Sequence, residues 1–467
     1  MTIGPRPTEH GPTATLAAFA AGLRSEDLSG EERHAAGRHL LDTLGACIAG
    51  ATGHVTALAR DAMAEMGKGG AVPVPGFAGR FDPLTAAWLG GVSAHGLEVD
   101  DGYRAGSVHP GAVVIPAVLS AAAGKGVDGR RLITAIAVGY ELSTRLAEAM
   151  HPASRNRGFH NTPVVGVMAA AAAVGSLYRL PPAAMEMALG IAASSAAGLF
   201  AFLHGGGEIK RLHAGFAARE GLLAAVLAQK GMTGPRGVLE VEDGYFQAYS
   251  GMEAGDRLVE GLWPRAGGRP LNITRCYVKP YACCRHIHPA IDAVLAIMDA
   301  EGASGDEIAT VQSATYAIAE KHAHGDWRDM ATAQLSYQFC VATAMRHGEL
   351  SIRRFDDASR SDEVTQSYCE KVAVTIDEEC QASYPSLRSA KVTVTLRDGR
   401  QAFRFIDEPS GSARHPLSDE ALKEKYLGLA GPVMGIERAQ RAAELVDRIE
   451  ALDRADDLLA ALARPQA

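Results

Sequence analysis

The sequence lacks the motifs that mark nucleotide, zinc-protease and dithiol redox sites. No GxGxxG follows a strand in a βαβ setting and no GxxxxGK[ST] occurs, so nucleotide binding is not indicated. The helical HExxH arrangement of zinc proteases and the CxxC pair of thioredoxin-like proteins are also absent. These absences exclude the function classes that depend on such motifs.

An excess of positive charge and long apolar runs are missing as well. The net charge of −8 argues against nucleic acid or an anionic membrane as a partner. The most apolar stretches, 164–180 and 187–203, are short for membrane spans and contain glycine, so we predict buried helices there. The first residues include no apolar run of the signal-peptide kind, so we expect a cytoplasmic protein without a secretory signal.

The seven cysteines do not suggest a disulfide framework, because their number is odd and five of them are scattered. Cys283 and Cys284 lie close to His286 and His288 in the sequence, which raises the question of a zinc site. Adjacent cysteines seldom both ligate one tetrahedral ion, since the usual spacing leaves two or more residues between them. We therefore predict reduced thiols and no metal.

Hydrophobic periodicity predicts two domains in the 467 residues. Residues 1–268 read as helical almost throughout, as in 33–50 and 219–232, and their many alanines and glycines imply closely packed helices. Residues 269–408 read as a smaller α+β domain, and 409–467 as a helical return to the first domain. The predicted fold class is mainly α, with a large all-helical domain and a smaller α+β domain.

The secondary-structure predictions for the second half follow from the period of the apolar residues. Strands are predicted at 272–281, 307–317, 371–379 and 390–407, the last as a hairpin through Asp398-Gly399. Helices are predicted at 288–300, 332–348, 353–357, 418–431 and 437–463.

Three histidines stand at expected helix starts. His109 and His288 each precede a proline, and His160 precedes Thr162, a good N-cap, and Pro163 at the first helical position. A helix N-terminus offers unpaired N–H groups and partial positive charge, which attract an anion and discourage protonation of a nearby imidazole. Any one of these histidines alone fits a structural role, so the hypothesis rests on their coincidence.

Basic side chains accompany these histidines. A glycine triplet, 205–207, precedes a helix that carries Lys210 and His213 one turn apart. Lys279 and Arg285 lie just before the expected helix at His288. A lysine on a helix is most often solvated, but together these residues predict a cradle for a negatively charged substrate.

Four stretches resemble the successive signature blocks of the MmgE/PrpD family: HGLEVDDGYRAGSVHPGAVVIPA (95–117), GFHNTPVVGVMAAAA (158–172), IKRLHAGFAAREGLLAAVLAQKGMTGP (209–235) and KPYACCRHIHPAIDA (279–293). QLSYQFCVATAMRHGEL (334–350) is also similar to that family. The family includes 2-methylcitrate dehydratase, cis-aconitate decarboxylase and iminodisuccinate epimerase. The resemblance implies a helical domain with an α+β lid domain, a homodimer, an active site between the domains, and no metal or organic cofactor.

Carried over by position, the resemblance places the family's catalytic residues on His109, His160, Lys210 and His288. The family's acidic block falls on 95–102 and adds Asp101, which could otherwise be part of a plain turn. The sequence departs from that block at Glu98, where aspartate is expected, and at Gly102, where threonine is frequent. The substrate-binding candidates are Glu98, Tyr103, Arg104, Thr162, His213, Lys279 and Arg285.

The resemblance implies a lyase, either a dehydratase or a decarboxylase, acting on a small di- or tricarboxylate of the methylcitrate or aconitate type. His109 and His160 would act as general acid and base, and Lys210 would hold a carboxylate or protonate the departing group. An isomerase or epimerase that moves an α-proton on a small dicarboxylate is the alternative, and the departures at Glu98 and Gly102 give it some weight. A non-catalytic member of the fold is the third reading.

Overall fold

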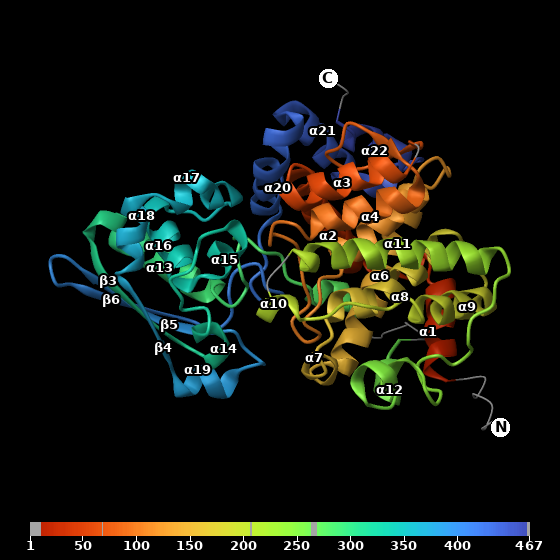
Figure 1. Cartoon of the computed structure of the whole chain (residues 1–467), viewed down its shortest axis with the longest axis horizontal. Helices are drawn as coiled ribbons and strands as arrows, with labels where there is room; N and C mark the ends of the chain where they lie inside the picture. Colours follow the sequence, from red (N-terminus) through yellow and green to blue (C-terminus); the bar gives the residue numbers. More distant parts are fainter. Residues whose placement is uncertain (1–10, 68, 206–207, 263–268, 465–467) are drawn as a thin grey trace. The chain divides into compact units, whose positions relative to one another are not determined.

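The computed structural model describes residues 11–67, 69–205, 208–262 and 269–464 (Figure 1). These residues form two compact units. Unit 1 comprises Met1–Tyr277 and Ser418–Ala467, and unit 2 comprises Val278–Leu417. In the described ranges no helix combines the length and the hydropathy that crossing a bilayer requires.

Unit 1 is helical apart from the antiparallel pair β1 (Val72–Pro73) and β2 (Arg80–Phe81) among its described residues. Its helices are α1 (Pro12–Gly22), α2 (Gly30–Gly50), α3 (His54–Met66), α4 (Pro83–Ala94), α5 (Gly111–Ala122), α6 (Gly129–Met150), α7 (Ala153–Asn156), α8 (Asn161–Leu177), α9 (Pro182–Ala193), α10 (Phe202–Gly205), α11 (Ile209–Gln229), α12 (Tyr245–Ser250), α20 (Asp419–Met434), α21 (Ile436–Asp447) and α22 (Asp456–Leu462).

Helix α8 forms the centre of this unit and packs against α5, α6 and α11. Every residue of α8 except Ser176 is buried. Small residues allow the close approach: a Cβ on Gly221 of α11 would lie 2.5 Å from the Val167 carbonyl oxygen of α8, and one on Gly139 of α6 would lie 2.5 Å from Val114 of α5. The predicted close packing of alanine- and glycine-rich helices is confirmed.

The helix predicted over 187–203 is wrong beyond Ala193, where α9 ends. The chain then runs beside the start of α8, and the Gly198 carbonyl accepts a hydrogen bond from the His160 N–H at 3.0 Å. Gly198 has φ +123°, which favours glycine, and a Cβ there would strike Pro163. The segment therefore leaves the helix to pair with the residue that caps α8.

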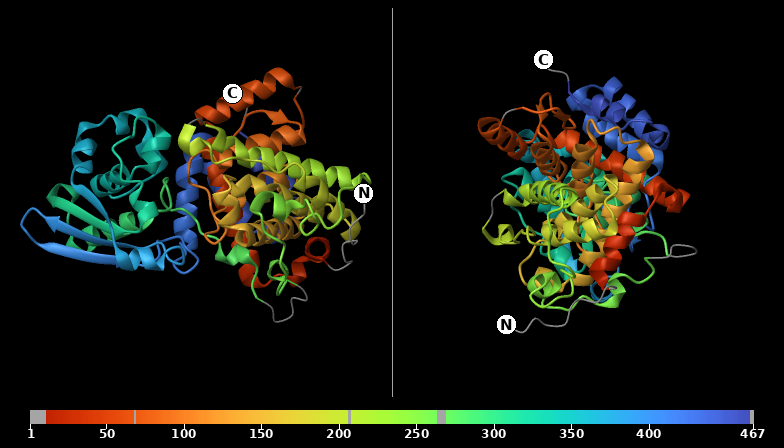
Figure 2. Two further views of the ribbon diagram at one scale, coloured as in Figure 1. Left: turned by 60° about the horizontal axis from the view of Figure 1, so that its bottom comes forward. Right: turned by 90° about the vertical axis from the view of Figure 1, so that its right-hand side faces the viewer.

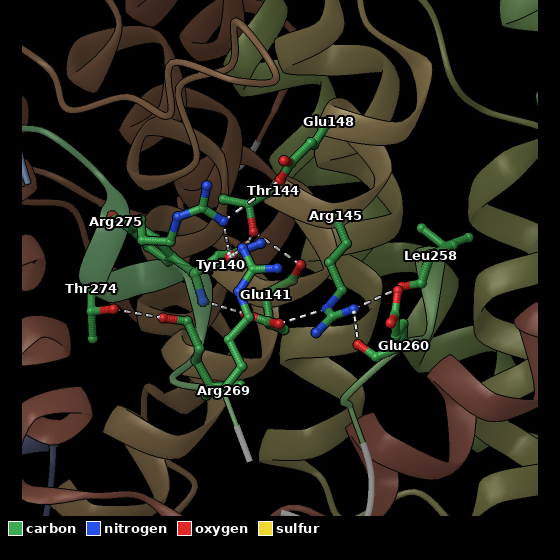
Figure 3. A network of polar contacts seen from close by, with 12 residues as sticks. Tyr140, Glu141, Thr144, Arg145, Glu148, Leu258, Glu260, Arg269, Thr274 and Arg275 are labelled. Atoms are coloured by element: carbon green, nitrogen blue, oxygen red, sulfur yellow. Dashed lines mark hydrogen bonds and ion pairs between the residues drawn. The ribbon is translucent and has the colours of Figure 1, made fainter. Parts of the chain in front are cut away.

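The strand predicted over 272–281 is also wrong, because 272–275 form the 3₁₀ helix η3 (Asn272–Arg275). Figure 3 shows this segment beside α6. The Glu141 carboxylate of α6 accepts the Asn272 N–H at 2.6 Å, and Glu141 also binds the Arg145 guanidinium at 2.6 Å. Anchoring of the backbone by a buried carboxylate replaces the ladder that the alternating sequence suggests.

Unit 2 contains a four-stranded sheet in the order β4 (Val372–Ile376), β3 (Ile308–Thr315), β5 (Ala390–Leu396), β6 (Gln401–Ile406). β3 and β4 are parallel, and the β3–β5 and β5–β6 pairs are antiparallel. The predicted strands at 307–317 and 371–379 and the hairpin at 390–407 are confirmed. Figure 2 shows the β5–β6 hairpin extending past the helices of its unit.

The helices of unit 2 are α13 (His288–Glu301), α14 (Ala317–Glu320), α15 (Met330–Leu335), α16 (Tyr337–His347), α17 (Asp357–Arg360), α18 (Glu363–Cys369) and α19 (Glu378–Ser383). α13 packs on β5 and β6, and α16 packs on α13. The single helix predicted over 332–348 is broken at Ser336, which is extended and caps α16 by accepting the Phe339 N–H at 3.3 Å.

Gly102 has a structural requirement of its own. Its N–H and carbonyl bridge to Tyr277 at 3.0 and 2.8 Å, and a Cβ would lie 2.5 Å from the Tyr277 ring carbon Cζ. Because Tyr277 occupies the space that a side chain would need, this position requires glycine and not threonine.

We predict that Gly102→Ala lowers the free energy of unfolding by about 1–3 kcal/mol through overpacking. Gly428→Ala in α20 is the matched control, because a Cβ there meets nothing within 4 Å. Chemical denaturation of the two variants checks this, and equal stability of both would contradict it.

Candidate active site

A buried carboxylate joins the end of α4 to the start of α5. The Asp100 Oδ2 lies 2.7 Å from the Nδ1 of His95 and 3.2 Å from the Nδ1 of His109. His95 is the C-cap of α4, and His109 precedes Pro110, the N-cap of α5. Asp100 is 1% exposed, so the loop between the two helices folds over it. The two rings therefore meet through one oxygen atom.

Burial and hydrogen bonding determine the protonation states of Asp100 and His95. Burial alone would raise the pKa of Asp100, but the charges of His109 and His95 and their hydrogen bonds hold it well below its usual range. Burial is the largest effect on His95 and lowers its pKa to about 4. At neutral pH, Asp100 is thus ionised and His95 is neutral.

The ring of His109 is oriented by two acceptors. Besides Asp100, its Nδ1 lies 2.6 Å from the Asp101 carbonyl oxygen. Both contacts require a proton on Nδ1, which leaves Nε2 as the nitrogen that can exchange a proton with a substrate. The side chain of His109 is 17% exposed, against 1% for His95. Of these two histidines, His109 is therefore the more exposed.

The side chain of Asp101 is fully buried and makes contacts within unit 1. Its Oδ1 accepts the Gly111 N–H at 3.0 Å and its Oδ2 accepts the Tyr140 hydroxyl at 2.7 Å. Asp101 thereby ties the first turn of α5, next to His109, to α6. These contacts are those of a positioning residue, and a catalytic role of Asp101 stays a prediction.

A second pair of histidines joins α8 to α11. The Nδ1 atoms of His160 and His213 are 3.0 Å apart, so one ring donates a proton and the other accepts it. Burial is the main cause that lowers the pKa of His160 well below its ordinary value and that of His213 to about 4. The expectation that His160 stays neutral agrees with these shifts, although burial is their largest cause. The ring of His160 also stacks at 5.8 Å on that of His95, which joins the two groups.

The helix boundary at His160 differs from the prediction. The helix α8 begins at Asn161 with His160 as its N-cap, so Thr162 is not the N-cap. Asn161 fixes this earlier start, because its side chain accepts the Ser154 hydroxyl at 2.5 Å and donates to the Gly106 carbonyl at 2.7 Å. The Thr162 hydroxyl instead accepts the His109 N–H at 3.2 Å. It thus holds one candidate histidine beside the other.

Lys210, in the first turn of α11, forms an ion pair with Glu98. The charge of Lys210 contributes to the lowered pKa of both His95 and His213. Glu98 has φ 56°, an uncommon conformation for a residue other than glycine. The glycines 206 and 207 of the predicted triplet before α11 lie outside the described residues.

Tyr103 and Arg104 make contacts with residues other than the candidate histidines and Lys210. The buried Tyr103 hydroxyl donates to Glu148 at 2.5 Å, and the Arg275 guanidinium lies 5.3 Å from its ring. Figure 3 shows Glu148 on α6 and Arg275 beside this helix. Arg104 is half-buried in a turn in which its carbonyl accepts the Ser107 N–H at 3.2 Å. Their substrate contacts stay predictions.

Unit 2 holds the remaining predicted residues. The Nδ1 of the fully buried His288 lies 2.9 Å from the Arg285 guanidinium, and its Nε2 lies 3.3 Å from the Cys283 carbonyl. Arg285 also donates to the Ser410 and Pro409 carbonyls at 2.7 and 3.1 Å. Burial, followed by the charges of Arg285 and Lys279, lowers the pKa of His288 well below its ordinary value. Lys279 itself is 2% exposed.

Sequence reasoning missed His95 and Asp100 as members of the site. Both residues lie in the acidic block 95–102, from which the sequence predicted roles only for Glu98 and Asp101. The signal was the pairing of a histidine with an aspartate five residues later across a helix end. An apolar cavity of about 330 Å³ was also unforeseen, and it is lined in part by His213, Pro163, Phe202, Ile209 and Phe216.

The histidine–aspartate group has one further chemical possibility. Ligand atoms of His95, Asp100 and His109 all lie within 4.8 Å of one another, as in a metal site. The Nδ1 contacts at 2.7 and 3.2 Å are hydrogen-bond distances, so the carboxylate is already engaged by the rings. The absence of a metal stays a prediction.

Imidazoles oriented by a buried carboxylate and placed beside an ammonium group form acid–base machinery of the kind that enzymes use. The chain belongs to the MmgE/PrpD family: the family's N-terminal domain matches residues 14–256 and its C-terminal domain matches 281–451. This confirms the family resemblance and the mainly α fold with a smaller α+β part.

Similar proteins cover nearly the whole chain. The cis-aconitate decarboxylase-like protein oryM of Aspergillus oryzae is 28% identical over 98% of this chain and 99% of its own. The cis-aconitate decarboxylase of Aspergillus terreus is 28% identical over 96% and 94%. The human cis-aconitate decarboxylase is 26% identical over 97% and 95%.

We predict that the folded protein loses stability as the pH falls from about 6.5 to about 4. Histidines with a folded pKa near 4, such as His95 and His213, bind protons only when unfolded in this window, so their contribution is complete above 6.5 and declines below it. The loss at pH 4 is on the order of 3 kcal/mol for His95 alone.

Thermal unfolding midpoints measured between pH 7.5 and 4.5 check this prediction. The decline should be shallower in His213→Gln and unchanged in His54→Gln, which replaces an exposed histidine. A midpoint independent of pH, or equal slopes in the wild type and the His213 variant, would contradict it.

Proposed function

We propose that the protein is a lyase that acts on a small polycarboxylate of the aconitate or methylcitrate type, with decarboxylation as the first reaction to test. The observation that carries this proposal is the junction of the Asp100-held His109 with the His160–His213 pair and Lys210, in a chain similar to cis-aconitate decarboxylases over nearly its full length. A lyase reaction requires an acid and a base, and these residues would supply both.

The acid is His109. Decarboxylation breaks a C–C bond, and its electron pair passes to a carbon conjugated with a remaining carboxylate. Protonation of the carbanion by His109 completes the reaction. The ionised Asp100 stabilises the imidazolium before the transfer, and Lys210 stabilises the extra negative charge on the substrate.

The base is the neutral pair His160–His213. In a dehydration, one of these rings would take the proton next to a carboxylate while His109 protonates the departing hydroxyl, so that water leaves. Burial keeps the two rings neutral and thus able to accept a proton at neutral pH. The same machinery therefore serves either lyase reaction, and the substrate decides which bond breaks.

Glu98 competes with the substrate for the Lys210 ammonium group. The ion pair means that a substrate carboxylate must share or displace the Glu98 carboxylate. This provides a physical reason for a substrate-selecting role of the residue that departs from the family's aspartate. We propose that His288, Lys279 and Arg285 of unit 2 bind substrate, that the protein is a homodimer of its 49.0 kDa chain, and that it is cytoplasmic.

Proton NMR in D₂O with cis-aconitate, methylcitrate and citrate as substrates tests this function. We expect loss of CO₂ or water in the wild type and a decrease of ~10²–10⁴ in rate in His109→Ala and Lys210→Ala. Exchange of the α-hydrogen without net product would instead assign an epimerase. No change in any polycarboxylate, or unaltered rates in both variants, would contradict the proposal.

The same assay tests the predicted absence of a metal. Dialysis against EDTA should leave the rate unchanged. Loss of the rate and its return on addition of a divalent ion would assign His95, Asp100 and His109 to a metal centre.

We predict that Asp100→Asn lowers the rate by ~10²–10⁴ with the fold retained, because a neutral amide lacks the negative charge that stabilises an imidazolium. Asp61→Asn, which changes a carboxylate that is 64% exposed, is the matched control. A rate in Asp100→Asn within a few-fold of the control would show that Asp100 does not orient the acid.

A further inference from the structure

A cysteine in unit 2 is paired with a histidine outside the groups described above. Cys284 lies just before α13, and its Sγ is 3.5 Å from the Nε2 of His322, which follows α14. Both residues are half-buried, whereas the six other cysteines, all of them in the described part of the chain, are buried. Cys284 is therefore the cysteine that reagents in solution can reach most readily.

The tautomer of His322 is set by the backbone. Its Nδ1 lies 3.0 Å from the Leu335 carbonyl oxygen at the end of α15, so Nδ1 carries a proton and donates it. Nε2 then faces the Cys284 sulfur as the acceptor of the thiol proton. A base held in this way beside a thiol is the arrangement by which proteins activate a cysteine nucleophile.

The charges around the sulfur favour the thiolate. Burial alone would raise the pKa of Cys284, but the charge and hydrogen bond of His322, the N–H of His286 and the charge of Lys279 outweigh it and lower the pKa to about 6. The pKa of His322 is raised in turn by Cys284. Burial, with a smaller contribution from the charge of Cys284, raises the pKa values of Tyr316 and Cys340, so both stay neutral.

The ring of His322 is also held from its face. The ring of His286 stacks on it at 6.0 Å, and the Nδ1 of His286 is fixed by the Tyr316 hydroxyl at 2.7 Å. Burial is the largest cause that lowers the pKa of His286 well below its ordinary value, followed by the charges of Arg388 and His322. His286 therefore stays neutral, and the positive charge nearest the sulfur belongs to His322.

Five of the six other cysteines differ from Cys284 in the direction of their pKa shift. Burial raises the pKa of Cys47, Cys276, Cys340, Cys369 and Cys380 above the ordinary thiol value. Thiolate, and not thiol, is the nucleophilic form of cysteine. Reactivity at neutral pH should therefore concentrate at one position.

We propose that Cys284 and His322 form a thiolate–imidazolium pair that makes Cys284 a covalent modification site for soft carbon electrophiles. In the reaction with a haloacetamide, the sulfur forms a bond to the methylene carbon and the halide leaves, while the proton of the former thiol stays on His322. No oxidant or further reactant takes part. The site does not depend on the proposed lyase activity.

Alkylation of the full-length native protein by iodoacetamide tests this proposal, with intact-mass kinetics and peptide mapping between pH 5 and 9. We expect the first adduct on Cys284, at least about tenfold faster at pH 7 than on any other cysteine, with a rate that is half-maximal near pH 6. A first adduct elsewhere, an even distribution over several cysteines, or a half-maximal rate above pH 8 would overturn the proposal.

Two variants separate the pair from simple exposure. In His322→Gln, the half-maximal rate should move above pH 8, and the rate at pH 7 should fall about tenfold. Cys283→Ser is the matched control, because it removes the adjacent buried thiol and should leave the wild-type profile in place. An unchanged profile in His322→Gln would show that exposure alone explains the reactivity, and the wild-type pH profile decides the question if that variant does not fold.

Discussion

The buried carboxylate of Asp100, shared by the Nδ1 atoms of His95 and His109, is the interaction on which the site in unit 1 depends. A carboxylate that is 1% exposed is costly to bury unless it is paired and hydrogen-bonded. The two rings satisfy that requirement and are oriented by it. Asp101 accepts the Gly111 N–H at the start of α5, and Thr162 of α8 accepts the backbone N–H of His109. These two hydrogen bonds fix the backbone around His109. The loop after α4 is thus a rigid support for an acid–base group.

Charge is distributed unequally within this site. Burial keeps His95, His160 and His213 neutral, and the Lys210 ammonium is balanced by Glu98. The positive charge of this group is therefore partly neutralised, within a chain of net charge −8. Under the proposed function, a substrate carboxylate that binds Lys210 would rearrange the Lys210–Glu98 pair and so change the electrostatics of the neighbouring histidines.

The sequence predicted the helical character of unit 1 and most strands of unit 2, because hydrophobic period and a hairpin at Asp398-Gly399 are local signals. It failed where tertiary contacts override local pattern. The alternation at 272–281 suggested a strand, yet Glu141 anchors that backbone to α6. The candidate histidines were recognised from helix starts. The partners Asp100 for His109 and His213 for His160 required the fold, since the distances of 3.2 and 3.0 Å join residues that no local pattern connects.

The tautomer of His109 is the central claim, and ¹⁵N NMR of the protein with labelled histidine measures it directly. The His109 signals are assigned by their absence in His109→Gln. The account predicts a proton on Nδ1 that is shielded from exchange by Asp100 and the Asp101 carbonyl, with Nε2 as the nitrogen left for proton exchange. A His109 ring that carries its proton on Nε2, with Nδ1 unprotonated beside Asp100, would contradict it.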